Sequence, residues 1–318
     1  MPDDPNAPPY AASAASASAP PPIPPRTRPP VRDRTGLAIL LMCATSFIFA
    51  LQDGFSRVLG EGYPPALVVM IRYWVFAVFV IALVSRQPGG LKRAIRTRRP
   101  VTQILRGVIL ALEVMIMVEA FVRLGLVETH AVFTAYPLLV AALSGPVLGE
   151  KVGWRRWTAI GIGFAGILVI LNPGGGVLQI EALLPFVAAL MFALYGLLTR
   201  HVSRDDPSMV SFFWTAIAGA VAMTAVGIWD WQWLAPIDWL WMVGLCLCGM
   251  SSHYLLIRAY ELAEASALQP FAYTQLVWVS ILGVVVFSEV LRPNVVVGAV
   301  IVVLAGLFTL WRARVKSA

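Results

Sequence analysis

The feature that most constrains the fold of this chain is a series of ten long apolar segments, separated by short polar or Gly- and Pro-rich stretches. A helix that crosses about 30 Å of hydrocarbon needs about 20 residues, because each residue adds about 1.5 Å. We predict a transmembrane helix, with ends uncertain by several residues, in each of these segments: 36–58, 65–84, 101–122, 126–148, 156–171, 178–199, 209–228, 238–259, 265–288 and 294–312. The predicted fold class is all-α, a polytopic membrane protein.

The composition supports lipid as the solvent of most of the chain. Hydrophobic residues make up 59% of the sequence and charged residues 13%, whereas soluble domains carry about 25% charge. The net charge of +7 does not indicate nucleic-acid binding, because the basic residues lie in short segments between apolar runs. We therefore expect membrane lipid, and no nucleic acid, as a partner.

Motifs for cofactors or metals give no support to an enzyme. Residues 161–166 match the letters of a dinucleotide-binding pattern but lie inside an apolar segment, where glycines allow helices to approach closely. The three cysteines lie in apolar segments, and the pair Cys246 and Cys248 has no nearby histidine or cysteine. We expect no cofactor, no metal and no enzymatic activity.

The distribution of Lys and Arg predicts the orientation. With a cytoplasmic N-terminus, eighteen of the 24 basic residues fall in cytoplasmic segments and three in outer ones. Basic residues concentrate on the cytoplasmic side of membrane proteins. We predict an inner-membrane location with both termini cytoplasmic, which requires an even number of spans.

Three regions divide the chain. Residues 1–34 are rich in Pro and Ala and should form a disordered cytoplasmic tail. Residues 35–172 and 176–314 resemble each other weakly at an offset of 139, at which Val140 matches Val279 and Glu150 matches Glu289. Five helices in each half give the halves opposite topology, so we predict a 5+5 inverted repeat, an architecture typical of secondary transporters.

Several stretches together resemble the drug/metabolite transporter superfamily, EamA type, in particular its S-adenosylmethionine uptake and riboflavin carriers. They span residues 36–312 and include Leu105-Arg106-Gly107, Tyr136-Pro137-Leu138, Leu148-Gly149-Glu150-Lys151, Trp154-x-x-Trp157, 161–166, 253–260 and Pro270-x-x-Tyr273-x-Gln275-Leu276-Val277-Trp278. The resemblance implies ten helices in two repeats and transport of small organic molecules without ATP.

Charged residues within apolar segments are the first candidates for substrate contact, because a charge at the bilayer centre costs about 2.5–3.5 kcal/mol on insertion scales. Asp53 is four residues from Arg57, so a local ion pair and a role in a cavity both stay open. Arg72 and Glu113 have no opposite charge within one turn; they could form a pair that fixes helix packing or contact a charged substrate. His253 could carry a coupling proton, or make an interhelical hydrogen bond.

Polar and aromatic residues beside mid-helix prolines are the second set. Tyr136 precedes Pro137, and Tyr273, Gln275 and Trp278 follow Pro270. A proline frees a backbone carbonyl, which membranes tolerate only beside protein or a water-filled cavity. These side chains could line a substrate cavity for a planar or zwitterionic ligand, or simply pack the bundle.

The predicted function is secondary transport of a small metabolite by alternating access around a midplane cavity. A non-transporting membrane scaffold or sensor, or an intramembrane enzyme, is the alternative. The sequence does not choose the substrate or the direction of transport, and it leaves open whether two copies associate.

Overall fold

A computed structural model describes residues 35–149, 153–171, 181, 183–203, 205–262 and 265–315. Within these ranges the chain is helical and contains no strand. The predicted tail at 1–34 and the predicted repeat residue Glu150 lie outside the described residues. The helices longer than one turn are α1 (Thr35–Gly62), α2 (Pro65–Ser85), α3 (Gly90–Ile95), α4 (Pro100–Leu124), α5 (Leu126–Phe133), α6 (Tyr136–Leu148), α7 (Trp154–Leu171), α8 (Leu183–Val202), α9 (Ser208–Gly227), α10 (Pro236–Leu262), α11 (Ala265–Ala272), α12 (Thr274–Phe287) and α13 (Pro293–Val315).

Each of the ten predicted segments contains a helix, or a pair of helices in line. Among the described residues, seven stretches are long and apolar enough to cross a membrane, and α7 and α13 each include a shorter apolar stretch. The chain is therefore a multi-pass membrane protein.

Two segments predicted as single helices are each broken in the middle. The segment predicted at 126–148 divides into α5 and α6, and the one predicted at 265–288 divides into α11 and α12. At each break a threonine hydroxyl, on Thr134 or Thr274, donates to the carbonyl three residues earlier, at 2.7 and 2.6 Å respectively. Pro137 cannot donate a backbone hydrogen bond, which favours the first break. Adding 139 to the bounds of α5 gives 265 and 272, the bounds of α11.

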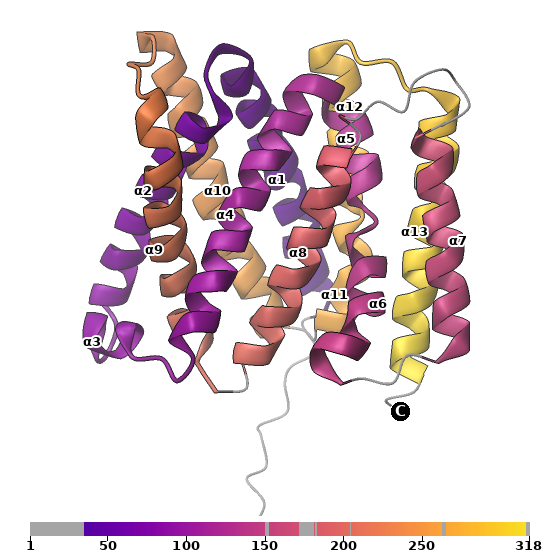
Figure 1. The fold of residues 1–318 in the computed structure, drawn as a ribbon, viewed down its shortest axis with the longest axis horizontal. Coiled ribbons are helices and arrows are strands. Elements are labelled where there is room, and N and C mark those ends of the chain that lie inside the picture. Colours follow the sequence, from indigo (N-terminus) through magenta and orange to yellow (C-terminus); the bar gives the residue numbers. More distant parts are fainter. Residues whose placement is uncertain are drawn as a thin grey trace, which may run out of the picture. The chain divides into compact units, whose positions relative to one another are not determined.

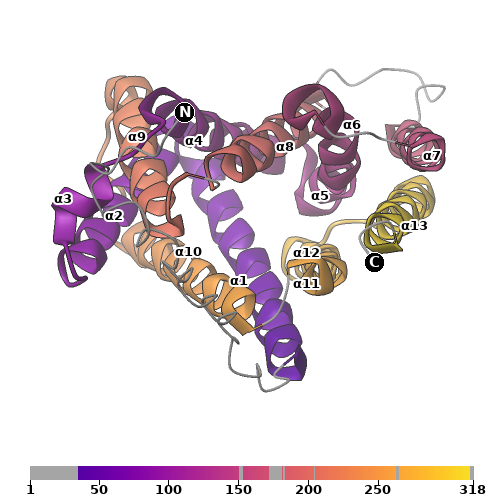
Figure 2. The ribbon, with the colours of Figure 1, turned by 90° about the horizontal axis from the view of Figure 1, so that it is seen from below.

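Helices from the first half of the chain pack mainly against helices from the second half. The closest pairings are α1 with α10, α7 with α13, α4 with α8 and α9, and α2 with α9. Seen from below, α7 and α13 lie side by side at one end of the bundle, while α1 crosses its middle (Figures 1 and 2). Helix α1 thus lies where both halves can contact it.

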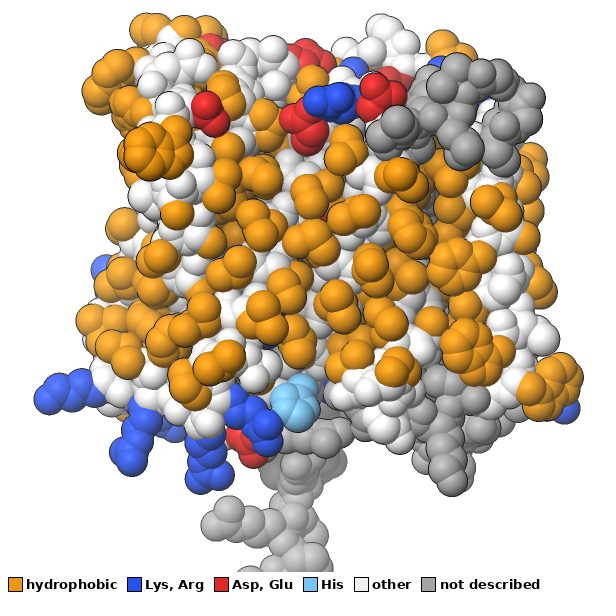
Figure 3. All heavy atoms as spheres, in the orientation of Figure 1, with side chains coloured by type: hydrophobic (Ala, Val, Ile, Leu, Met, Phe, Trp, Pro, Cys, Tyr) orange, Lys and Arg blue, Asp and Glu red, His pale blue; other side chains and the backbone are white. Residues whose placement is uncertain are grey.

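The surface of the bundle fits a bilayer. On the face in Figure 3, hydrophobic side chains cover a broad middle band and charged side chains gather at the two ends, with Lys and Arg concentrated at the end near α3. Exposed tryptophans accompany both ends of the helices: Trp229 and Trp233 beside the loop before α10, and Trp154 at the start of α7. Tryptophan is enriched at membrane–water interfaces.

Candidate functional site

A small polar cavity lies between the two helix breaks. Its volume is about 40 Å³, and its walls come from α5, α6, α11 and α12 and the residues at the breaks. It is lined by His130, Phe133, Thr134, Tyr136, Pro137, Ala272, Tyr273, Gln275 and Leu276. Three of the predicted site residues, Tyr136, Tyr273 and Gln275, therefore line one cavity.

Asp53 of α1 lies next to this cavity and joins two of its walls. One carboxylate oxygen, Oδ2, is 3.0 Å from Nε2 of His130 and accepts a hydrogen bond at 3.1 Å from the amide of Gln275. Of the two interpretations of Asp53, the local pair with Arg57 is wrong, because Arg57 binds Glu61 and Glu289 instead. Another pair of opposite charges four residues apart, Glu119 and Arg123 of α4, does form an ion pair.

Aromatic rings surround the cavity. Phe133 and Tyr136 each contact the ring of Phe192 on α8, with centroids 5.5 and 4.9 Å apart. Trp278 of α12 does not line the cavity; it packs edge-on against Phe47 of α1, with ring centroids 5.2 Å apart. The Tyr273 hydroxyl and the Trp278 Nε1 are buried and make no hydrogen bond within the described part of the chain. Buried polar groups are normally satisfied, so these two atoms are candidates for ligand contact.

Arg72 of α2 and Glu113 of α4 do not line the cavity. They are close enough to interact electrostatically, but among the described residues they form neither a hydrogen bond nor an ion pair with each other. A side chain placed at Gly249 of α10 would approach both the Arg72 guanidinium and the amide oxygen of Gln52. That Gln52 oxygen is also buried without a partner in the described residues. The predicted direct pairing of Arg72 with Glu113 is therefore wrong in this conformation.

His253 is separate from the cavity. Its Nδ1 lies 2.8 Å from the carbonyl oxygen of Gly249, one turn earlier on the same helix. Its ring contacts Phe49, Phe76 and Phe212. The hydrogen bond is within α10 rather than between helices, which corrects the predicted interhelical bond.

Two functional candidates were not predicted. His130 lies in an apolar segment, and its partner Asp53 is 77 residues away in sequence. Arg106, in the second turn of α4, has only 1% of its surface exposed. Its guanidinium donates to Tyr195 and Thr199 of α8 and to the Ser211 carbonyl and Thr215 of α9. Arg106 thus ties α4 to two helices of the second half.

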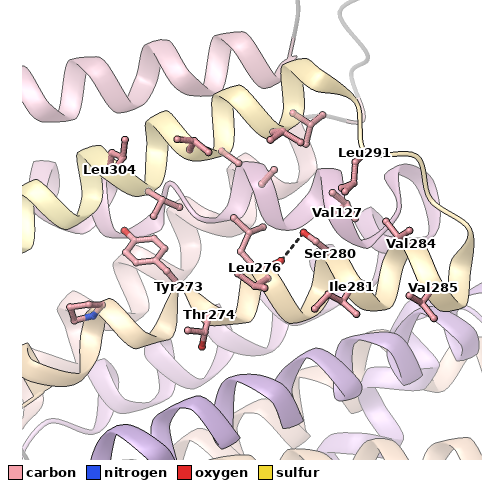
Figure 4. Close-up of a pocket in the computed structure, with 18 residues that line it drawn as sticks. Val127, Tyr273, Thr274, Leu276, Ser280, Ile281, Val284, Val285, Leu291 and Leu304 are labelled. Atoms are coloured by element: carbon pink, nitrogen blue, oxygen red, sulfur yellow. Dashed lines mark hydrogen bonds between the residues drawn. The ribbon is translucent and has the colours of Figure 1, made fainter.

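A second, larger cavity opens on the outside of the bundle. It is an apolar groove of about 730 Å³ between α12 and α13, with Val127 and Ala131 of α5 at its base (Figure 4). Tyr273 and Leu276 line both this groove and the small polar cavity. The ring of Tyr273 points toward α13 (Figure 4), and a Cβ at Gly306 would overlap its hydroxyl. These two side chains form part of the wall between the polar cavity and the groove.

A cluster of three or more histidine, cysteine, aspartate or glutamate side chains that could hold a metal does not occur in the described residues. The arrangement instead offers hydrogen bonding, aromatic surface and one carboxylate–imidazole pair inside a membrane. Groups of these kinds hydrogen-bond to small molecules and stack on them.

The chain belongs to the EamA-like transporter family, whose sequence model matches residues 36–172 and again residues 179–311. An S-adenosylmethionine uptake transporter of Rickettsia prowazekii is 25% identical, with 86% of this chain and 92% of that protein covered. A riboflavin transporter of Vibrio cholerae is 28% identical, with coverage of 86% and 93%. A pseudopaline exporter of Pseudomonas aeruginosa is 24% identical, with coverage of 86% and 96%.

A crystal structure of another protein has the same fold. It is 18% identical, and the alignment covers 88% of this chain and 99% of that one with a TM-score of 0.61. Taken with the family, the similar proteins support a membrane transporter of small metabolites.

Proposed function

We propose that this protein is a secondary transporter that moves a planar, heteroaromatic metabolite across the inner membrane by alternating access. The observation that carries the proposal is the aromatic, partly polar cavity between the two helix breaks, which at about 40 Å³ must widen to hold such a molecule. Broken helices in secondary transporters supply free backbone groups to substrates near the midplane. The relatives named for riboflavin and S-adenosylmethionine carry cargo with fused heteroaromatic rings, which suits a cavity bordered by Phe133, Tyr136 and Phe192.

The proposal includes ten spanning helices arranged as two inverted five-helix repeats. The equal bounds of α5 and α11 under an offset of 139, and the two matches of the family model, support this arrangement. Rocking of one repeat against the other would expose the cavity to each side in turn. We place both chain ends in the cytoplasm, where eighteen of 24 basic residues would then lie.

In this mechanism Tyr136, Tyr273 and Trp278 provide ring surface and hydrogen-bond donors for the substrate. Gln275 offers an amide at the same wall, and Asp53 holds that amide in place. Arg72 of α2 and Glu113 of α4 would take charged groups of the substrate when the cavity widens. His253 would support the same region of α10.

Uptake into proteoliposomes tests the function. Radiolabelled riboflavin, S-adenosylmethionine and leucine are offered to liposomes with the purified protein and to empty liposomes. We expect uptake of at least one heteroaromatic compound and none of leucine. Uptake of leucine alone would reject the substrate class, and folded protein that moves none of a wider metabolite panel would favour a scaffold.

Matched variants connect the uptake to the cavity. Trp278→Leu should lower uptake at least several-fold, whereas Val285→Ala, at an exposed lipid-facing position of α12, should leave it unchanged. Equal uptake by both variants would remove Trp278 from the site. A reporter fused to the C-terminus tests orientation: a periplasmic phosphatase should be inactive there and a fluorescent protein active.

A further inference from the structure

The pair formed by Asp53 and His130 is unusual in its position. The residues are 9% and 4% exposed, belong to α1 and α5, and lie inside apolar stretches long enough to cross a membrane. An ionised carboxylate in such surroundings is costly unless it is paired. Imidazole and carboxylate can share one proton between them at 3.0 Å.

Aromatic rings border the pair, and the nearest charged side chains have partners of their own. His130 stacks on Phe121, with ring centroids 5.4 Å apart, and Phe133 meets its edge. Arg57, one turn further along α1, forms ion pairs with Glu61 and Glu289. The buried carboxylate of Glu113 on α4 also interacts electrostatically with Asp53.

The remaining neighbours complete the surroundings. Glu113 in turn interacts with Arg72 of α2. On α12 the facing group is the amide of Gln275, which is neutral. His253 of α10 faces Phe49 of α1 rather than Asp53. Protonation of the pair therefore changes the charge at one well-defined place.

The side chain of Gln275 contacts both the Asp53–His130 pair and the polar cavity. Its amide donates to Oδ2 of Asp53, the same oxygen that faces His130, and its side chain also lines the polar cavity. A hydrogen bond to an ionised acceptor is about twice as strong as one between neutral groups. A proton taken up by the pair, held by the imidazole or shared with Oδ2, lowers the negative charge available at that oxygen. It would weaken the hold on Gln275 and leave its amide available to a substrate.

We infer that the Asp53–His130 pair carries a coupling proton and that Gln275 makes proton and substrate bind together. This rests on the proposed transport function and makes the protein a proton symporter. One proton enters the pair from the outer side with the substrate bound in the cavity. The same proton leaves from the pair to the inner side as the substrate is released, and Gln275 then returns to the ionised carboxylate.

A proton-binding measurement without substrate tests the pair itself. Proteoliposomes are adsorbed on a solid-supported membrane and exposed to a pH step, and the transient current is recorded. We expect a current in the native protein and its loss in Asp53→Asn and His130→Gln. The matched control is Glu119→Gln, at the partly exposed Glu119–Arg123 pair, which should keep the current. A native-sized current in both pair variants would overturn the inference.

A second measurement tests coupling with riboflavin and S-adenosylmethionine as probes. For one proton per substrate, an inward gradient of one pH unit should raise accumulation about tenfold. Gln275→Leu should keep the proton current and lose this stimulation; if it also lost the current, Gln275 would not act as the link. Uptake that does not change with the pH gradient, or proton movement opposite to that of the substrate, would contradict proton symport without contradicting the proposed transport function.

The two proposals can fail separately. If neither probe is taken up but the pH-step current still depends on Asp53, the proposed substrate class is wrong and the proton site stands. Gel filtration and circular dichroism of each variant establish that it is folded. A pair variant that does not fold is replaced by the double variant Asp53→Asn with His130→Asn, which leaves no unpaired charge.

Discussion

The carboxylate of Glu289 lies 2.9 Å from the backbone nitrogen of Val127, so a residue beyond the end of α12 caps the start of α5. Its other oxygen accepts from the backbone nitrogen of Leu126 at 2.7 Å and from Arg57 of α1. Gly125 makes this possible, since it has a φ of +83° and a Cβ there would crowd the carboxylate. One carboxylate thus connects α1, α5 and the loop between α12 and α13.

Replacing Glu289 should destabilise the protein. Loss of a helix cap costs about 0.5–2 kcal/mol, and Glu289→Ala also leaves Arg57 with only the exposed Glu61. We expect a lower thermal unfolding temperature in detergent for Glu289→Ala than for the control Glu61→Ala. Equal unfolding temperatures would show that the cap contributes little.

The Arg106 network should be sensitive even to a conservative change. Arg106→Lys keeps the charge but replaces five N–H donors in a fixed geometry by three on one nitrogen. The lysine cannot donate hydrogen bonds to α8 and α9 at the same time. We expect a clear loss of monodisperse protein in gel filtration. Arg86→Lys, at an exposed residue after α2, is the control and should behave like the native protein. A native yield of Arg106→Lys would mean that charge alone is sufficient.

Asp206, in the loop between α8 and α9, should make the free energy of unfolding depend on pH in the acidic range. Burial raises its pKa, but hydrogen bonds from Thr97, Gln103 and the Arg98 backbone outweigh burial and hold the pKa below its usual value. A depressed folded pKa adds stability above the unfolded pKa of about 3.9, and this is lost as pH falls through the folded value.

Unfolding temperatures of native protein and Asp206→Asn should therefore differ at pH 7 and converge below about pH 4. Asp230→Asn, at an exposed aspartate, should track the native protein throughout. A constant difference between native protein and Asp206→Asn at every pH would contradict the assignment to the carboxylate charge.

Tyr273→Phe separates binding from stability. The Tyr273 hydroxyl is buried without a partner in the described residues, and removing an unsatisfied polar group does not destabilise a protein. We expect an unfolding temperature equal to or above the native value, together with weaker substrate uptake through a higher KM. Tyr254→Phe, on an exposed ring of α10, should change neither. Unchanged KM for Tyr273→Phe would exclude its hydroxyl from substrate contact.

Hydropathy and segment length located the helices well, because lipid demands long apolar helices whatever their packing. The breaks at Thr134 and Tyr273 were missed, although Pro137 and Pro270 were noted. A criterion based only on an apolar length of about 20 residues cannot distinguish one spanning helix from two consecutive shorter helices. A signal that could have shown them is a threonine near the middle of each segment, Thr134 and Thr274, which lie one position apart under the offset of 139.

The cavity was predictable only in part. Tyr136, Tyr273 and Gln275 were found because a proline marks each region, and the structure brings them together. The partner of Asp53 was not, because the rotation of α5 about its axis decides whether His130 faces α1 or lipid. Nothing in the local sequence determines that rotation, and the nearer Arg57 was the obvious partner by spacing alone.

The apolar groove between α12 and α13 has a practical consequence for handling the protein. Lipid or detergent chains fill this groove, so part of the van der Waals packing of α12 and α13 comes from the surrounding hydrocarbon. The unfolding temperature of the purified protein should therefore rise with the chain length of the detergent. Added phospholipid should raise the unfolding temperature again in a short-chain detergent.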